Sequence, residues 1–153
     1  MLDPDCWLRE NSLGTNTEPR VSVGHICIEV SDITRSRKFY EPMLKNLGFR
    51  TIMEEKDSIG FSNGSLSIFL GQPTSRRVER NAPSVDEFVV ADHIALLVPD
   101  RNTVNEVALI MKNAGFEPLF PAEEHPEFVA GYYSVSFCDP DNYVIEFYLV
   151  DKR

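Results

Sequence analysis

The chain has 153 residues, of which 24 are acidic and 15 basic, so its formal net charge is −9 at pH 7. This charge argues against nucleic acid or an anionic membrane surface as the main partner, and no apolar run approaches the roughly 20 residues that a membrane-spanning helix needs. The length allows one core of moderate size, or two small modules that share one.

Cysteine usage indicates the compartment. Cys6, Cys27 and Cys138 are odd in number and widely spaced, and no Cys-x-x-Cys pair occurs. This pattern is typical of reduced cysteines in a cytosolic protein and argues against a zinc–thiolate site. The first ten residues lack the basic and apolar regions of a signal peptide. We therefore expect a cytoplasmic protein.

Residues 1–20 are polar and without periodicity, and we expect them to form a flexible extension outside the core. The next segment, residues 21–73, has the pattern of a strand, a helix and three further strands. The predicted elements are the strand Val21–Val30, the helix Thr34–Leu47 and the strands Phe49–Met53, Ser58–Ser62 and Leu66–Leu70. Ser31 or Asp32 is expected to cap the helix, and Pro42 to kink it or split it in two.

A hydrophilic linker, residues 74–90, precedes a second unit, residues 91–150, with the same order of elements. These are the strand Ala91–Val98, the helix Asn102–Ala114, the strand Phe116–Phe120, the loop Pro121–Ala130 and a closing hairpin of Gly131–Cys138 and Tyr143–Val150. The residues between the last two strands, Asp139-Pro140-Asp141-Asn142, are typical of a tight turn.

The first strands of the two units are copies of one another. His25 and His93 stand at matching places, and each is followed by the pattern Ile-x-(Ile/Leu)-x-Val-x-Asp. The turn after the helix is also repeated, as residues 45–49 and 112–116. The sequence therefore predicts a duplicated fold unit with a pseudo-twofold axis.

One set of side chains in this arrangement is typical of a metal site. In the last strand, Glu146 lies opposite the apolar face that packs under the helices, and the pseudo-twofold axis is expected to bring His25 and His93 to it. Two imidazoles and one carboxylate suit zinc, iron, manganese or nickel. Superposing the units places Ile68, or Ser67 after a one-residue slip, on Glu146, so the first unit supplies no second carboxylate. The alternative is that the histidines only make local hydrogen bonds.

Further candidates surround this predicted centre. His125 is expected either to be an exposed loop residue or to hang over the cup as a proton shuttle, and Tyr133 is a second candidate for a catalytic role. The candidate substrate-binding residues are Cys27, Ile68, Phe128, Tyr132 and Tyr148. The aromatic members of this set also suit the core, and Cys27 is expected to be a small buried filler.

Several motifs agree with those of a known superfamily. They are Gly24-His25-Ile26, Ser31-Asp32, Phe39-Tyr40-Glu41-Pro42, Leu47-Gly48-Phe49, Asp92-His93-Ile94-Ala95 and Asp139-Pro140-Asp141-Asn142-Tyr143-x-Ile145-Glu146. With these motifs the segment from Val21 to Val150 resembles the vicinal oxygen chelate superfamily of glyoxalase I, bleomycin-resistance proteins, fosfomycin-resistance enzymes and extradiol dioxygenases. It is most similar to small glyoxalase-like proteins of undefined reaction.

The resemblance implies an α+β fold in which two tandem βαβββ modules form a half-barrel cup around one divalent metal ion. It also implies that His25, His93 and Glu146 hold the ion. The fourth ligand of glyoxalase I, a glutamate that also acts as the base, falls at Ile68, which argues against lactoylglutathione lyase activity. The tyrosine that extradiol dioxygenases place on the strand before the glutamate falls at Ser136, which weakens that assignment too.

Three functions remain open. We favour a divalent-metal-dependent enzyme that acts on a small substrate through vicinal oxygens, as a glyoxalase-like lyase or isomerase or as an extradiol-type dioxygenase. The alternative is a metal-independent module that binds a drug or metabolite, as bleomycin-resistance proteins do, where an acidic protein would favour a cationic ligand. The third is a structural relic without metal. A homodimer is compatible with each, since a partner often covers the exposed edges of half-barrels.

Overall fold

The computed structural model describes residues 22–73 and 93–151. The expected N-terminal extension and linker lie outside the described residues. Each described segment folds as a strand, a helix and three strands, which confirms the predicted α+β fold of two tandem modules. The first module contains β1 (His25–Glu29), α2 (Ile33–Asn46), β2 (Arg50–Glu55), β3 (Ser58–Ser62) and β4 (Ser67–Gly71). The second contains β5 (His93–Leu97), α4 (Arg101–Asn113), β6 (Phe120–Glu124), β7 (Tyr132–Cys138) and β8 (Val144–Val150).

The strands form two separate four-stranded sheets, in the orders β1-β4-β3-β2 and β5-β8-β7-β6. In each sheet the first strand pairs in parallel with the last strand of its own module, and the other pairs are antiparallel. The histidine-bearing strands β1 and β5 are therefore the outer strands of their sheets. Each keeps one edge that is not paired with another described strand.

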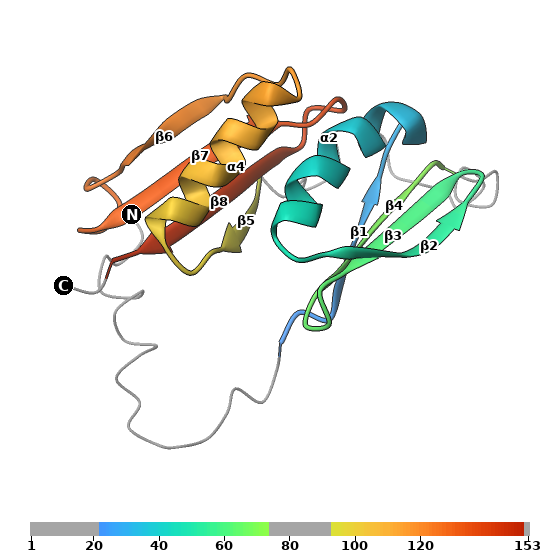
Figure 1. The fold of residues 1–153 in the computed structure, drawn as a ribbon, viewed down its shortest axis with the longest axis horizontal. Helices are drawn as coiled ribbons and strands as arrows, with labels where there is room; N and C mark the ends of the chain where they lie inside the picture. The colour runs from blue at the N-terminus through green and yellow to red at the C-terminus, as the bar shows by residue number, and fades with distance from the viewer. Residues whose placement is uncertain (1–21, 74–92, 152–153) are drawn as a thin grey trace, which may run out of the picture.

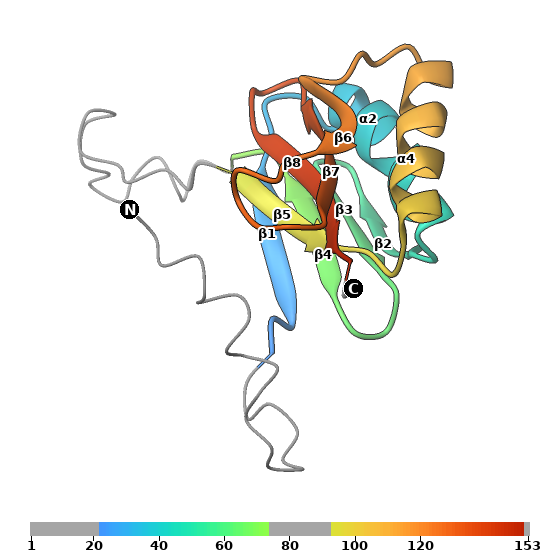
Figure 2. The same ribbon diagram turned by 90° about the vertical axis from the view of Figure 1, so that its left-hand side faces the viewer.

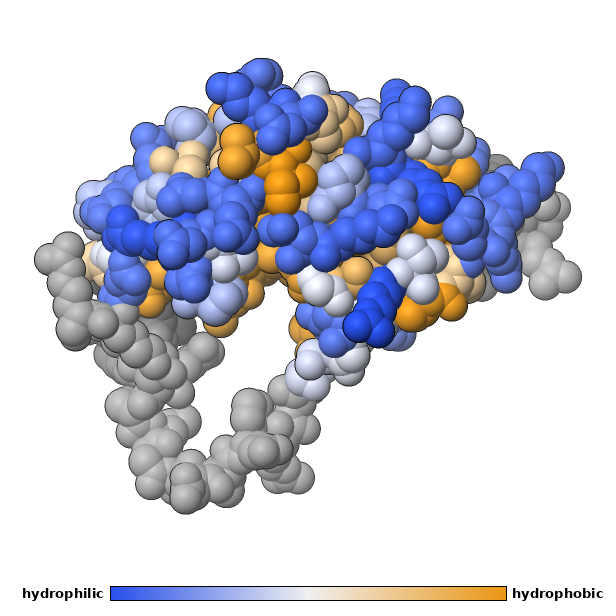
Figure 3. All heavy atoms as spheres, viewed as in Figure 1, coloured by the Kyte–Doolittle hydropathy of each residue, from blue (hydrophilic) through white to orange (hydrophobic). Residues whose placement is uncertain are grey.

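Both helices cover the same side of the two sheets, so that the molecule has a helical layer and a sheet layer (Figures 1 and 2). Side chains between the layers form the core, with Phe39, Met43 and Leu44 of α2 and Val104, Val107 and Met111 of α4 fully buried. The surface on the helical side is mostly hydrophilic (Figure 3). The opposite face of each sheet has no helix over it among the described residues, which leaves that face available for a binding site.

The two helices begin in the same way. Oδ1 of Asp32 accepts a 2.9 Å hydrogen bond from the backbone N–H of Arg35, and Oδ1 of Asp100 accepts a 2.8 Å bond from that of Thr103. Both aspartates are thus helix N-caps, which occupy otherwise unpaired backbone donors. The capping residue is Asp32 and not the alternative, Ser31.

Two predicted elements differ from the structure. Pro42 does not split its helix, because α2 continues through it as one segment whose neighbouring side chains, Phe39 to Leu44, are packed into the core. The strand expected at Phe116–Phe120 was wrong, since β6 begins only at Phe120. Phe116 instead packs edge-on against Phe39 of the other module, with ring centroids 5.1 Å apart. Pro121 is accommodated because β6 is an edge strand with an irregular register.

Contacts between the modules fix how they are joined. The buried Tyr40 hydroxyl donates a 2.7 Å hydrogen bond to Oδ2 of Asp139, in the turn between β7 and β8. In the same turn, Asp141 accepts hydrogen bonds from the backbone and hydroxyl of Ser31 and from the guanidinium of Arg35. The turn of the second module therefore binds the start and middle of α2. Of the described helices, neither is both long and apolar enough to cross a membrane.

Candidate metal centre and its cavity

The second module brings two of the predicted ligands together. His93 is the first residue of β5 and pairs with Val144 of β8, while Ala95 pairs with Glu146. This parallel register leaves the imidazole diagonal to the carboxylate, and Nε2 of His93 lies 3.2 Å from Oε2 of Glu146. Glu146 is only 8% exposed. A buried carboxylate is kept in this way only when hydrogen bonds or opposite charges compensate its desolvation.

The second oxygen of Glu146 is held by a tyrosine. The Tyr132 hydroxyl, on β7, donates a 3.0 Å hydrogen bond to Oε1 of Glu146. Burial, together with the nearby carboxylate, raises the pKa of this hydroxyl above its usual value, so it stays a donor at neutral pH. The Tyr132 ring stacks on Tyr148, with centroids 5.2 Å apart and planes at 13°. The carboxylate is therefore fixed on one side and turned toward His93 on the other.

The pair opens into a cavity of about 780 Å³ on the open face of the second sheet. Its walls come from β5, β6, β7, β8 and the loop after β6. The lining residues are His93, Leu119, Phe120, Glu123, Glu124, His125, Glu127, Phe128, Ser134, Ser136, Val144 and Glu146. A volume of this size suits a small organic ligand.

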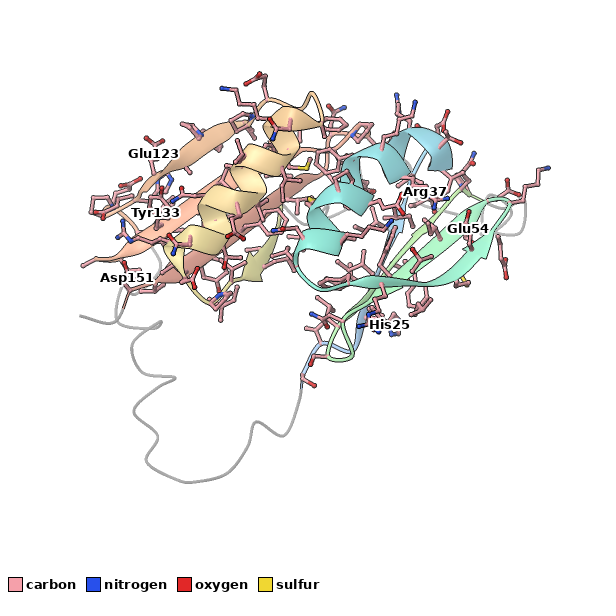
Figure 4. All side chains as sticks on the ribbon, in the orientation of Figure 1. His25, Arg37, Glu54, Glu123, Tyr133 and Asp151 are labelled. Carbon is pink, nitrogen blue, oxygen red and sulfur yellow. The ribbon has the colours of Figure 1, made fainter. Side chains whose placement is uncertain are left out.

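The third predicted ligand stands apart. His25 lies on β1 of the first module, exposed, with its ring edge-on to Phe69 at a centroid distance of 6.0 Å. Figure 4 shows His25 on the first module, away from the labelled residues of the second. Among residues 22–73 and 93–151, no three His, Cys, Asp or Glu side chains are grouped closely enough to hold a metal ion. One copy of the chain thus joins His93 to Glu146, but not to His25.

The His93–Glu146 pair itself fits a metal ion. Nitrogen and oxygen donors bound to one zinc at ~2.0–2.2 Å lie roughly 3 Å apart, close to the 3.2 Å found here. The pair faces a cavity instead of packed side chains, so further positions around an ion would be open. Imidazole and carboxylate are the donor types of catalytic zinc and iron sites.

The register corrects the expected equivalence between the modules. His25 pairs with Ser67 and Cys27 with Phe69, just as His93 pairs with Val144 and Ala95 with Glu146. The residue that corresponds to Glu146 is therefore Phe69, and neither Ile68 nor Ser67. Ile68, expected to bind substrate, points to the helical side, is 3% exposed in the core and does not line the cavity. An aromatic ring occupies the place of a second carboxylate.

A glycine makes room for that ring. Gly60 of β3 pairs with Phe69, and a Cβ at position 60 would lie 2.7 Å from two Phe69 ring atoms. Cys27, which was expected to be buried, is exposed on the same face and borders a smaller cavity of about 210 Å³ with Phe69. Its neighbour strand β4 covers only one side of β1, which explains the exposure.

The loop after β6 places two further candidates over the cavity. The His125 side chain is 15% exposed, and its Nδ1 lies 3.0 Å from Oε1 of Glu127. Its ring stacks on Phe128, with centroids 5.6 Å apart and planes at 27°. Both rings line the cavity, so His125 lies at its wall and is not a fully exposed loop residue.

Tyr133, the other expected catalytic residue, points the other way and does not line the cavity. Its hydroxyl donates a 2.9 Å hydrogen bond to Oδ1 of Asn105 in α4, and the Arg101 guanidinium lies 4.6 Å above its ring. Residues next to each other on a strand face opposite sides. Tyr132 is therefore the tyrosine on the cavity side.

The cavity also contains residues that sequence reasoning missed. Ser134 and Ser136 share the face of Tyr132 by simple alternation, and Ser136 pairs with Glu146. Glu123 and Phe120 were missed because their strand was expected to lie earlier in the chain. The proline and acidic composition of β6 gave no strand signal.

Comparisons with known proteins agree with this architecture. The sequence model of the Glyoxalase/Bleomycin resistance protein/Dioxygenase superfamily matches residues 22–147. No curated protein matches the chain significantly.

Solved structures show the same fold. A glyoxalase/bleomycin resistance protein/dioxygenase family enzyme from Burkholderia phytofirmans has 16% sequence identity and a TM-score of 0.66, over 86% of this chain and 100% of the other. Lactoylglutathione lyase from Agrobacterium tumefaciens has 17% identity and a TM-score of 0.62, over 86% and 95%. A glyoxalase/dioxygenase from Nostoc punctiforme has 19% identity and a TM-score of 0.61, over 92% and 100%. At these identities the likeness extends to the fold alone.

Proposed function

Because this chain belongs to the Glyoxalase/Bleomycin resistance protein/Dioxygenase superfamily, we propose that it is a divalent-metal-dependent enzyme that acts on a small substrate through vicinal oxygens. The observation that carries the proposal is the 3.2 Å pair of His93 and Glu146 at the wall of a 780 Å³ cavity. The ion is zinc, iron, manganese or nickel, since each accepts imidazole and carboxylate ligands. A bound ion would supply Lewis-acid polarisation of the substrate oxygens.

The third ligand is His25 of the partner subunit in a homodimer. His25 and His93 hold equivalent places on the outer strands β1 and β5, each with one edge that no other described strand pairs with. A twofold axis that sets β1 of one copy against β5 of the other brings His25 of each copy toward the His93–Glu146 pair of the other, which gives two equivalent sites per dimer. Val23, two residues before β1, and Leu97, at the end of β5, are apolar side chains that are 63% and 71% accessible, which favours their burial against another surface.

The remaining residues have distinct roles. Tyr132 holds Oε1 of Glu146 and leaves Oε2 for the ion. His125 at the cavity wall accepts or donates the proton that the substrate exchanges. Phe69 leaves the first module without the carboxylate that a glyoxalase I reaction uses as its base, so a three-ligand reaction of the extradiol type, or a different lyase or isomerase reaction, is favoured. The unpaired thiols of Cys27 and Cys138 favour a reducing, cytoplasmic location.

Metal content per chain tests this proposal. Protein purified without a histidine tag is expected to bind about one ion per chain, and His93→Ala and Glu146→Ala are expected to lose it. A Glu106→Ala variant, changed on the exposed side of α4, is the matched control. Wild-type protein that stays metal-free after incubation with each of the four ions would refute the proposal.

Mixed dimers test the shared site. The variants His25→Ala and His93→Ala, each alone, have no complete site. In a mixed dimer the intact His25 of one chain meets the intact His93 of the other, and random pairing restores about a quarter of the wild-type sites. Restoration is impossible if all three ligands come from one chain, so a mixture without bound metal would contradict the twofold arrangement.

A metal-independent ligand-binding protein of the bleomycin-resistance type is the second candidate. It is favoured by the large cavity and by the presence of only two of the three ligands in one copy. Ligand binding that is unchanged by a chelator, in protein with no metal, would select this function over the first.

A further inference from the structure

We propose that the cavity of the second module selects small organic cations, with an ammonium group at its acidic rim, a flat apolar body in its middle and an oxygen at its floor. The inference rests on the proposed function, in that it names the substrate class of the same cavity. Its experiment, however, does not depend on a bound metal.

The charge of the walls is the first observation. Four lining side chains are glutamates, and no lysine or arginine lines the cavity within the described residues. Glu124 is paired with Arg101 at 2.6 Å, outside the cavity lining. Glu123 has no hydrogen-bond or ion-pair partner among the described residues, and Glu127 faces only His125. Glu123 therefore remains for a positive group, together with the Glu127 oxygen that His125 does not contact, while an anionic ligand would meet like charge.

Aromatic and apolar side chains provide the second observation. Phe120 and Phe128 are 53% and 59% exposed although both line the cavity, and Leu119 beside them is 45% exposed. The stack of Phe128 on His125 holds its ring in a defined plane. Exposed rings next to carboxylates attract a cation through both the ring face and the charge, and they cover a flat organic body.

The floor of the cavity provides the third observation. Ser134 and Ser136 are 2% and 6% exposed, and their hydroxyls have no hydrogen-bond partner among the described residues. Both residues line the cavity, and Ser136 stands directly opposite Glu146. Both hydroxyls reach the cavity, since neither is a fully buried side-chain atom without a partner. A ligand oxygen that reaches the floor would pair with them.

Three probes of the same size separate charge from shape. Tyramine, its neutral alcohol analogue tyrosol and 4-hydroxyphenylacetate share a phenol ring and differ in the charge of the tail. Binding is measured by titration calorimetry on the full chain at low salt, with a chelator present. Tyramine is expected to bind at least tenfold more tightly than 4-hydroxyphenylacetate, with tyrosol between them. Equal affinities, or the reverse order, would overturn the proposal.

Variants show whether the rim carboxylates cause the preference for tyramine. Glu123→Gln and Glu127→Gln are each expected to weaken tyramine binding about fivefold, as expected for a charge pair near 4 Å in water, and to leave tyrosol unchanged. Ser136→Ala is expected to weaken all three probes. Glu106→Gln, with the same change of net charge on the outer face of α4, is expected to change none.

The outcomes also distinguish this inference from the proposed function. A loss of tyramine affinity in Glu106→Gln as large as in Glu123→Gln would mean bulk charge alone, and would overturn the inference. Thermal melting of each variant checks that it is folded. Metal binding with a reversed probe order removes this inference but leaves the metalloenzyme. Selective tyramine binding by a protein that takes up no metal supports this inference and removes the metalloenzyme.

Discussion

The Tyr132 hydroxyl donates its hydrogen bond to the oxygen of Glu146 that does not face His93. This single contact comes from the neighbouring strand, and it sets the orientation of a buried carboxylate. Partners of this kind commonly change metal affinity by about 10- to 100-fold when they are removed.

We therefore expect Tyr132→Phe to weaken metal binding by about tenfold while the ring stack on Tyr148 is kept. The measurement is a competition titration with a coloured chelator. Tyr133→Phe is the control, because its hydroxyl contacts Asn105 on the helical side. Equal metal affinity in Tyr132→Phe and wild type would show that the hydrogen bond does not orient the ligand.

The hydrogen bond from Tyr40 to Asp139 is expected to be the main polar contact that joins the modules. Tyr40→Phe leaves the buried Oδ2 of Asp139 without this donor, so we expect a loss of about 1–3 kcal/mol in the free energy of unfolding. Urea denaturation measures it. Tyr143→Phe removes a hydroxyl with no hydrogen-bond partner among the described residues, and should cost much less. Similar losses in the two variants would count against a specific role for the Asp139 contact.

Phe69 offers a gain-of-ligand test. Phe69→Glu places a carboxylate at the position that the register assigns to Glu146 in the first module, and Gly60 leaves space for it. We expect this variant to bind a divalent ion more tightly than wild type, and Phe69→Gln, of the same size without charge, to bind it no better. Ile68→Glu should instead unfold the protein, since Ile68 is in the core. Tighter binding in a folded Ile68→Glu protein would show that the register is wrong.

The ion pairs of α2 predict a dependence of stability on pH. Hydrogen bonds from Arg37 and then Lys45 lower the pKa of Glu41 from 4.5 to about 2. A depressed folded-state pKa gives stability that is present above the unfolded-state value and is lost as pH falls toward about 2. The effect is small, because the pairs are partly exposed and screened by salt.

Wild type should therefore be slightly more stable than Glu41→Gln at pH 7, and this difference should vanish between about pH 4.5 and about pH 2. Urea denaturation of both proteins across this range, at low salt, provides the measurement. Glu117→Gln, at an exposed loop position, is the control. A stability difference that persists at pH 2 would mean that the glutamine disturbs α2 for another reason.

Much of the fold follows from local patterns. The copied His-Ile-x-(Ile/Leu)-x-Val-x-Asp segments predicted two equal modules, and the aspartate that ends each copy is the cap of α2 or α4. Alternation along β8 placed Glu146 on the open face, where the structure has it. These features depend on residues a few positions apart, so the sequence records them directly.

The candidate site depends on longer relationships, and there sequence reasoning was less successful. Only the register between neighbouring strands shows that Tyr132, and not Tyr133, lies on the open face of its sheet. The same holds for Phe69 as against Ile68. A shift of one residue reverses the face of every side chain, and no local pattern records the register of a parallel pair such as β1 and β4, which are far apart in the sequence. β6 was missed because its pairing with β7 overrides a weak strand propensity.

The sequence by itself determined that the chain has two βαβββ modules and that Glu146 lies on the open face of its sheet. Only the tertiary structure decided that His93 meets Glu146 while His25 stays apart. That outcome depends on how the modules join, through Tyr40 with Asp139 and Phe39 with Phe116. Tyr40 and Asp139 are 99 residues apart in the sequence, and the two residues of each pair belong to different modules. Periodicity within a module carries no information about packing between modules.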